Sequence, residues 1–274
     1  MPSKEVLDWL RVDFFPHIWC PGCGHGIIMH ALLRALASLG CEKERTVIAS
    51  GIGCSSRMPG YIDACTVHTT HGRSLVFATG IKLASPELTV VNVMGDGDCA
   101  AIGGNHFIHA CRRNIDITAV ILNNSIYGMT GGQVSPTTPI GAYATTAPYG
   151  VIDPPFDLCN LAAAAGATYV ARATVAQPQL IEQYIKKGIQ NKGFSVVEVM
   201  THCHTQFGRR NKLARPIDNI NRFKQVSVTK TKADAMKPEE LEGKIVIGEM
   251  MDRERPEYVE QYLRLIERAR GQVA

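Results

Sequence analysis

The sequence predicts a three-layer α/β/α protein built on a parallel sheet. Short runs rich in β-branched residues, such as TVIAS (46–50) and DITAVILN (116–123), are apolar on both faces, as buried strands are. Segments with helical spacing of apolar residues separate these runs. Strands and helices that alternate in this way form a parallel sheet covered by helices on both sides.

The first half of the chain is expected to supply two helices and three strands. GIIMHALLRALASLG has apolar residues at helical spacing and ends at Gly40, a typical helix stop. AIGGNHFIHACRR is predicted to be helical despite its glycines. In chain order the predicted elements are helix 26–40, strand 46–50, strand 87–94, helix 101–113 and strand 116–123.

The second half adds one strand, helix and strand, and then becomes more polar. Residues 125–157 are rich in Gly, Pro, Thr and Tyr, and a loop this long is usually functional. An amphipathic helix is predicted at 255–270. We therefore expect a domain of residues 1–207 and an extension of residues 208–274 that packs on this domain or on a partner subunit. The predicted elements are strand 166–172, helix 178–191 and strand 194–200.

Bulk composition excludes several classes of protein. The chain has 274 residues, of which 45% are hydrophobic and 20% charged, enough to bury a sizeable core. A net charge of +4 is too small to indicate a nucleic-acid binder. No apolar run is long enough to cross a bilayer, and MPSKEVLDWLRVDFF lacks the apolar region of a secretory signal. We therefore expect a cytoplasmic protein that binds no membrane.

Nine cysteines are a high count for such a protein. In a reducing compartment, clustered cysteines more often bind metal or take part in catalysis than form disulfides. Cys20 and Cys23 form a C-x-x-C pair in WCPGCGHG. This spacing by itself is compatible with a redox disulfide, half of a zinc site or half of an iron–sulfur site.

Polar side chains follow several predicted strands at the point where each strand ends. Cys54 follows strand 46–50, Asp96 follows strand 87–94, and Cys203 follows strand 194–200, while Asn123 and Asn124 end strand 116–123. In open α/β sheets, ligands bind at the carboxyl ends of the strands. The sequence therefore predicts one site along this edge.

The segment from Gly95 to Asn124 has the chemistry of a magnesium diphosphate site. Gly95 and Gly97 allow the backbone to approach a diphosphate closely, and Asp96 and Asn124 supply hard oxygen ligands for Mg²⁺. The 25 residues between GDG and NN suffice for one helix and one strand, so both ligands arrive from neighbouring strand ends.

Several motifs in order extend this pattern over residues 15–212: CPGCGHG, GIGCSS, HGR, GDGD, NN and YGMTGGQVSPTTP, followed by Cys203. Together they resemble the β subunit of the 2-oxoacid:ferredoxin oxidoreductases, which has the thiamine-diphosphate-binding fold. The resemblance implies thiamine diphosphate, Mg²⁺ and one 4Fe-4S cluster as cofactors. It assigns the cluster to Cys20, Cys23, Cys54 and Cys203.

The resemblance also assigns the remaining site residues. Ile126 would offer Mg²⁺ a backbone carbonyl beside Asp96 and Asn124. His71 would contact a phosphate. The residues expected to line thiamine diphosphate are Ile52, Gly53, Cys54, Ser55, His71, Gly95, Gly97, Asp98, Asn123, Gly128 and Met129.

The implied activity is the reversible oxidative decarboxylation of a 2-oxoacid with coenzyme A, with electrons passed to ferredoxin. MTGGQ–SPTTP together with FGRRNK is most like the 2-oxoglutarate type, which yields succinyl-CoA and CO₂. Branched-chain 2-oxoacids and pyruvate are the alternatives. The catalytic glutamate is expected on a separate α subunit of a hetero-oligomer, which in some members also contains small ferredoxin-like γ and δ subunits.

Three other classes remain open on the sequence. A non-redox thiamine enzyme would leave the cysteines without a function, and such chains are usually about twice as long. A non-catalytic iron–sulfur electron-transfer subunit would not need the GDG–NN motif. A zinc-stabilised scaffold would use the same four cysteines.

Overall fold

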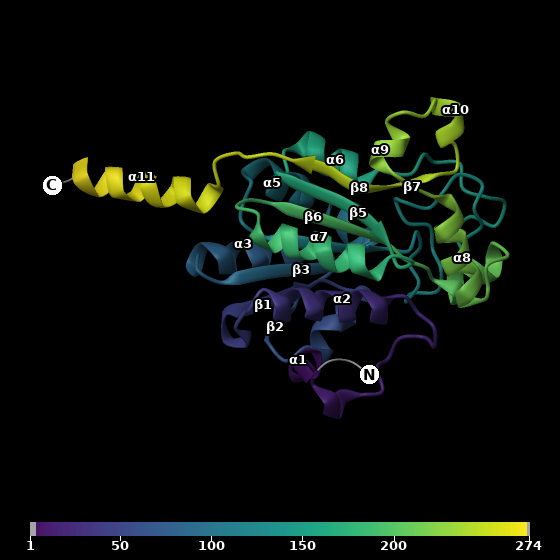
Figure 1. Ribbon diagram of the computed structural model, residues 1–274, viewed down its shortest axis with the longest axis horizontal. Coiled ribbons are helices and arrows are strands. Elements are labelled where there is room, and N and C mark those ends of the chain that lie inside the picture. Colours follow the sequence, from purple (N-terminus) through teal and green to yellow (C-terminus); the bar gives the residue numbers. More distant parts are fainter. Residues whose placement is uncertain (1–3, 273–274) are drawn as a thin grey trace.

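A computed structural model describes residues 4–272 and contains one 8-stranded sheet with the strand order β2-β1-β3-β4-β6-β5-β8-β7 (Figure 1). Neighbouring strands are parallel except β5 and β8, which are antiparallel. The strands are β1 Thr46–Ser50, β2 Cys65–His68, β3 Thr89–Gly95, β4 Thr118–Asn123, β5 Tyr169–Thr174, β6 Ser195–Met200, β7 Ser227–Thr229 and β8 Ile245–Asp252.

Helices cover both faces of the sheet, which confirms the predicted three layers. Adjacent strand residues point to opposite faces. Ile48 and Val120 pack with α2 and α7, whereas Val47 and Ile121 pack with α3, α5 and α6. The helices are α1 Lys4–Asp8, α2 His25–Ser38, α3 Ser74–Ala84, α4 Asp96–Ala100, α5 Gly104–Arg113, α6 Leu158–Ala165, α7 Pro178–Gln190, α8 Pro216–Val226, α9 Lys230–Ala233, α10 Pro238–Leu241 and α11 Tyr258–Gln272.

All five predicted strands are present, as β1, β3, β4, β5 and β6. The predicted strand 166–172 starts too early, because Gly166 ends α6 with a φ of 112° that glycine adopts readily. The predicted helix 101–113 begins only at Gly104, after a separate short helix and a turn. Sequence reasoning missed β2, whose residues are half exposed and lack a continuous apolar run.

The loop at 125–157 has no helix or strand within the described chain, as predicted, and folds through local turns and isolated bridges. Within residues 4–272, no helix combines the length and the apolar character needed to cross a bilayer.

The C-terminal segment adds strand β8 to the sheet beside β5 and then leaves the body of the molecule. Figure 1 shows α11, at the yellow end of the chain, projecting away from the sheet. Glu257 anchors its start, because one carboxylate oxygen accepts a hydrogen bond from the Asp116 amide at 2.9 Å and the other from the Glu260 amide at 2.8 Å. The predicted helix at 255–270 is thus present with slightly shifted ends.

Candidate active site

Four strands that are neighbours in the sheet, β1, β3, β4 and β6, deliver the predicted ligand residues to one edge. Cys54 follows β1, Asp96 follows β3, Asn124 follows β4 and Cys203 follows β6. The expectation that separate strand ends converge is therefore fulfilled by the strand order. Two adjoining hollows lie along this edge, one lined by thiols and one by carboxylates.

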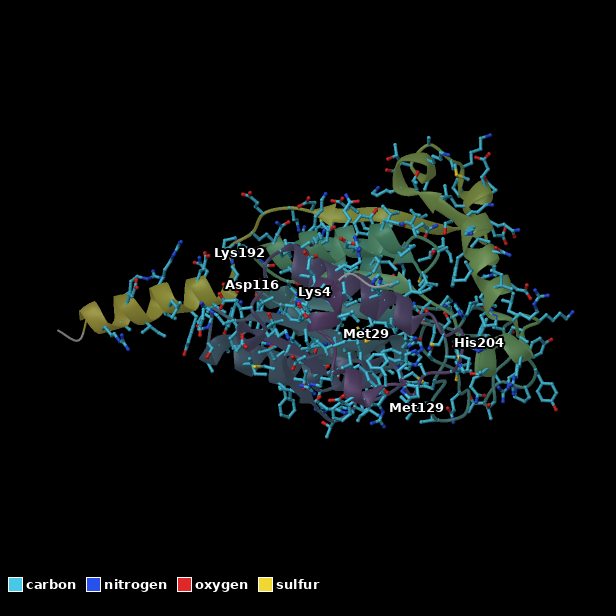
Figure 2. The ribbon with its side chains drawn as sticks, turned by 60° about the horizontal axis from the view of Figure 1, so that its bottom comes forward. Lys4, Met29, Asp116, Met129, Lys192 and His204 are labelled. Atoms are coloured by element: carbon cyan, nitrogen blue, oxygen red, sulfur yellow. The ribbon has the colours of Figure 1, made fainter. Side chains whose placement is uncertain are left out.

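The first hollow, here called the thiol cavity, has a volume of about 300 Å³ and contains all four predicted cluster cysteines in its lining: Cys20, Cys23, Cys54 and Cys203. The C-x-x-C pair enters it from a turn in which the Cys23 amide donates to the Cys20 carbonyl at 3.0 Å. Met129 and His204 line it too, and Figure 2 shows both at the end of the molecule opposite α11.

Burial makes ionisation of two of these thiols unfavourable. It raises the pKa of Cys23 to about 12 and that of Cys54 to about 11, and the neighbouring thiols add to the shift. The surroundings of Cys23 and Cys54 therefore favour their neutral thiol forms. Four thiolates in this cavity would need a positive charge between their sulfur atoms. Bound metal supplies such a charge.

The second hollow, here called the carboxylate pocket, is narrow, with a volume of about 40 Å³. It gathers residues from the ends of β1, β3 and β4, as well as the HGR turn. The predicted site residues in its lining are Ile52, Cys54, Ser55, His71, Gly95, Asp96, Gly97, Asp98, Asn124, Ile126 and Gly128.

Asp96 is buried at the first turn of α4, and two hydroxyl groups hold its carboxylate. Its Oδ2 accepts hydrogen bonds from Ser135 Oγ at 2.6 Å and from Thr137 Oγ1 at 2.7 Å. Burial raises the pKa of Asp96, and these donors oppose the rise. Two hydroxyl groups thus hold the carboxylate in place. Among the ion pairs of residues 4–272, none joins Asp96 to a basic side chain.

Asp98 ties three turns of the pocket together. Its Oδ1 lies 2.6 Å from His71 Nδ1 and accepts hydrogen bonds from the amides of Gly72 at 2.7 Å and Ile52 at 3.2 Å. Burial raises the pKa of Asp98, and these partners oppose the rise. Asp98 therefore fixes the positions of Ile52 and His71, two residues predicted to contact the cofactor.

Comparison with known proteins matches this architecture. A family model for the C-terminal, thiamine-pyrophosphate-binding domain of thiamine pyrophosphate enzymes covers residues 51–199. The 2-oxoglutarate synthase subunit KorB of Methanocaldococcus jannaschii is 56% identical over 267 residues, 97% of this chain and 99% of the relative. The KorB subunit of Archaeoglobus fulgidus is 56% identical over 223 residues, 81% of each chain. The chain belongs to the β subunits of the 2-oxoacid:ferredoxin oxidoreductases.

A solved structure agrees with this membership over nearly the whole chain. The 2-oxoglutarate:ferredoxin oxidoreductase of Magnetococcus marinus, with 2-oxoglutarate, coenzyme A and succinyl-CoA bound, superposes with a TM-score of 0.87. The two chains are 34% identical, and the match covers 98% of this chain and 92% of the other. The predicted resemblance and the predicted fold class are confirmed, and the chain is an oxidoreductase subunit most similar to the 2-oxoglutarate type.

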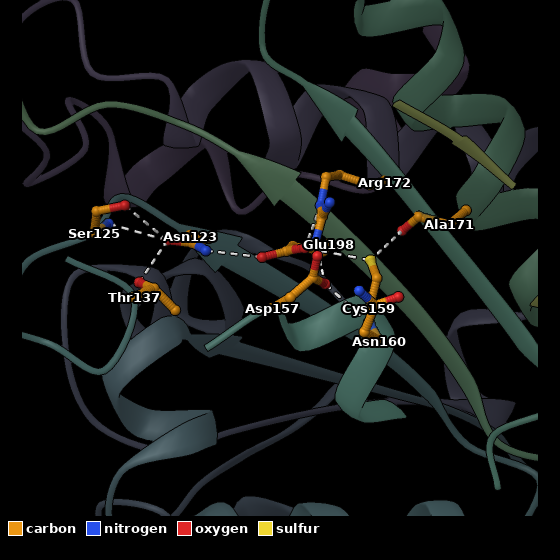
Figure 3. Close-up of polar contacts among 9 residues, drawn as sticks. All are labelled: Asn123, Ser125, Thr137, Asp157, Cys159, Asn160, Ala171, Arg172 and Glu198. Atoms are coloured by element: carbon orange, nitrogen blue, oxygen red, sulfur yellow. Dashed lines mark hydrogen bonds and ion pairs between the residues drawn. The ribbon is translucent and has the colours of Figure 1, made fainter. Parts of the chain in front are cut away.

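Three predicted cofactor contacts of this β subunit lie outside the carboxylate pocket. Met129 lines the thiol cavity instead. Among the described residues, Gly53 lines neither hollow. Asn123 donates from Nδ2 to Glu198 Oε1 at 2.8 Å and accepts from the Ser125 amide at 3.0 Å. Figure 3 shows the Asn123 side chain between Thr137 and Glu198.

Glu198 is the centre of a buried polar group beside the pocket. Its Oε2 accepts a hydrogen bond from Arg172 Nε at 2.6 Å and lies 3.3 Å from Cys159 Sγ. Arg172 also pairs with Asp157 at 2.6 Å (Figure 3). This group orients Asn123 and thereby supports the strand end that presents Asn124.

Sequence reasoning missed four residues of the β subunit site. Ser135 and Thr137 hold Asp96, and their hydroxyls in SPTTP were the available signal. Tyr127 Oη donates to the Gly97 carbonyl at 3.2 Å, and its ring lies so close that a Cβ at Gly97 would overlap it. His25 lines both hollows, which no sequence pattern indicated.

Proposed function

We propose that this chain is the β subunit of a 2-oxoglutarate:ferredoxin oxidoreductase. In the proposed reaction, 2-oxoglutarate and coenzyme A give succinyl-CoA and CO₂, and ferredoxin receives two electrons. The observation that carries the proposal is the shared wall of the two hollows, because His25, Cys54, Asn124 and Gly128 line both. A thiamine site and an electron acceptor that adjoin in this way suit a redox thiamine enzyme.

The carboxylate pocket fits a magnesium ion. Asp96 and Asn124 offer oxygen atoms, and the Ile126 carbonyl would complete the protein's share of the ligands. The raised pKa of Asp96 reflects a buried carboxylate whose negative charge a divalent cation would neutralise. Phosphate oxygens would fill the remaining positions, beside the backbone of Gly95 and Gly97.

The thiol cavity fits an iron–sulfur cluster, for which four thiolates are the usual ligand set. Among residues 4–272, no three His, Cys, Asp or Glu side chains gather closely enough to hold a single ion. The four thiols instead surround a space of about 300 Å³. This arrangement favours a 4Fe-4S cluster over zinc, whose four sulfur ligands lie about 2.3 Å from one centre.

The protein's own contribution is to orient these groups. When bound, thiamine diphosphate supplies the electron sink for decarboxylation, and the cluster supplies a one-electron acceptor. Asp98 holds Ile52 and His71, which would contact the cofactor, and Ser135 and Thr137 hold Asp96, which would bind the metal. Met129 lines the thiol cavity next to Gly128, which belongs to both hollows.

The assignment of 2-oxoglutarate rests on the relatives' names and on the loop motifs. The FGRRNK segment is joined to the long loop, because Asn211 Nδ2 donates to the Tyr143 carbonyl at 3.0 Å and the Tyr143 amide donates to Asn211 Oδ1 at 2.8 Å. We propose that the joined segments face the substrate side of the site. Branched-chain 2-oxoacids and pyruvate are the alternative substrates to be tested.

The partners and the division of the chain are part of the proposal. An α subunit would supply the glutamate that pairs with the thiamine pyrimidine, so the active site would form between the two subunits. Small ferredoxin-like γ and δ subunits and a free ferredoxin would carry the electrons onward. Residues 1–207 would hold the cofactors, and residues 208–274 would pack on this domain or on a partner.

The deciding experiment is an anaerobic purification of the complex of this chain with its α subunit. Its contents of iron, acid-labile sulfide, zinc and thiamine are then measured. We expect about four irons and four sulfides per chain, together with thiamine. Ferredoxin reduction should then be fastest with 2-oxoglutarate, compared with pyruvate and a branched-chain 2-oxoacid. Zinc without sulfide would exclude the redox mechanism, and iron without thiamine would favour a non-catalytic electron-transfer subunit.

A further inference from the structure

His25 lies where the two hollows meet. It is the first residue of α2, only 1% of its surface is exposed, and it lines both the thiol cavity and the carboxylate pocket. Its Nδ1 lies 3.1 Å from Cys23 Sγ. No role assigned above to cofactor or metal binding uses this imidazole.

The surroundings of His25 keep its ring in place. The ring packs against Trp19, with centroids 5.7 Å apart and planes inclined by 51°. Trp19 is fixed in turn, because its indole Nε1 donates to the Cys54 carbonyl at 2.7 Å. The imidazole thus packs against a ring that is itself hydrogen-bonded to the segment carrying Cys54.

The chemistry of a metal-bound cysteine decides the direction of the contact. A thiolate ligand has no proton and can only accept, so His25 Nδ1 must carry the hydrogen once Cys23 binds iron. Two of the other cysteines have longer contacts: Thr205 Oγ1 lies 3.5 Å from Cys203 Sγ and 3.9 Å from Cys20 Sγ. Cys23 therefore has the shortest and most buried hydrogen-bond partner of the set.

We propose that His25 is a positioning residue that donates a hydrogen bond from Nδ1 to Cys23 Sγ and thereby raises the reduction potential of the cluster. This inference rests on the proposed 4Fe-4S cluster. Reduction adds one electron to the cluster and breaks no bond. Because the reduced cluster is more negative, an N–H donor stabilises it more than the oxidised form, and hydrogen bonds to the sulfurs are a known determinant of the potential.

Two substitutions separate the hydrogen bond from simple space filling. His25→Leu fills much of the same volume without a donor, whereas His25→Asn retains an amide N–H near the position of Nδ1. In the complete complex we expect His25→Leu to shift the midpoint potential to more negative values in an EPR-monitored redox titration. His25→Asn should return it toward the native value, and one potential for all three proteins would overturn the proposal.

A measurement on the native complex covers the case in which a variant does not assemble. With ¹⁵N-labelled histidine, pulsed EPR of the reduced cluster should show a histidine nitrogen coupled to it. His202, which also lines the thiol cavity, contacts the Gly22 carbonyl instead at 2.9 Å, so His202→Gln should leave this coupling unchanged. A native cluster without histidine coupling, or coupling that disappears in His202→Gln, would overturn the proposal.

Iron and sulfide analysis keeps the two levels of inference apart. If the native complex lacks four irons and four sulfides per chain, the proposed function fails, whatever the role of His25. If the native cluster is complete and its potential does not depend on His25, only the present inference fails.

Discussion

The carboxylate pocket and the thiol cavity adjoin, yet the protein holds their ligand atoms in different ways. Asp96 is clamped by two hydroxyl donors at 2.6 and 2.7 Å, and Asp98 by three partners. The four thiols come from three distant parts of the chain, and burial raises the pKa of Cys23 and of Cys54. With the proposed cofactors, the carboxylate pocket would be arranged before magnesium binds, whereas the thiol cavity would need the positive charge of iron to form its ligand set.

The largest expected effect concerns the catalytic glutamate, which neither site contains. The isolated chain should bind iron and sulfide but turn over no 2-oxoglutarate, because the pyrimidine's glutamate is expected on the α subunit. Ferredoxin reduction by the chain alone and by the α/β complex, at equal cluster content, is the measurement. Turnover by the chain alone would place the missing carboxylate within this sequence.

Loss of one cluster cysteine should affect the thiol cavity without affecting the carboxylate pocket. Cys203→Ala removes one of four ligands, so we expect the cluster and ferredoxin reduction to be lost while thiamine content is retained. Iron, sulfide and thiamine analysis of the complex checks this. Cys65→Ala is the control, because Cys65 is exposed on strand β2, away from the cavity lining. A full cluster in Cys203→Ala would remove that residue from the ligand set.

Loss of the proposed magnesium ligand should have the opposite effect and leave the cluster intact. Asp96→Asn removes a charged ligand, and at roughly 1.5–3 kcal/mol for a charged partner we expect thiamine diphosphate to bind about 10- to 100-fold more weakly. Titration of the cofactor into protein with intact iron content is the measurement. Asp63→Asn, a change in an exposed ion pair with Lys43, should leave binding as it was. Equal loss of iron and thiamine would mean that the two sites assemble as one.

A smaller effect should follow from loosening the clamp. Thr137→Val removes one donor to Asp96, and at roughly 1–2 kcal/mol the affinity for Mg²⁺ and thiamine diphosphate should fall about tenfold. Thr145→Val is the matched control in the same loop, since its exposed hydroxyl donates to the Gly131 carbonyl at 2.6 Å and not to Asp96 or to its partner Ser135. If both variants weaken binding equally, the effect belongs to the loop and not to the clamp.

The same variant gives a pH signature. The folded-state pKa of Asp96 is already raised by burial, so lowering the pH protonates it and weakens metal binding. Removing the Thr137 donor takes away a contribution that lowers this pKa. The midpoint of cofactor binding against pH should therefore move to higher pH in Thr137→Val and stay in place in Thr145→Val, whose hydroxyl donates to the Gly131 carbonyl. A midpoint that does not move would show that Thr137 does not act through Asp96.

The sequence by itself determined the five central strands of the sheet and the residue types at their carboxyl ends. Strands β1, β3, β4, β5 and β6 are buried on both faces, so their apolar runs are legible locally. The motif order then led to the family, which the relatives confirm. Elements without such a local signal, such as the half-exposed β2, were missed.

Only the tertiary structure decided which of these residues meet and in which direction their side chains point. The order β1-β3-β4-β6 makes neighbours of the strand ends that carry Cys54, Asp96, Asn124 and Cys203, and no local pattern encodes that order. Asn123 contacts Glu198, which lies 75 positions away in the chain, and not the pocket. Ser135 and Thr137 reach Asp96 from a loop with no periodicity. Hydrogen bonds between such distant segments depend on packing, which sequence spacing does not record.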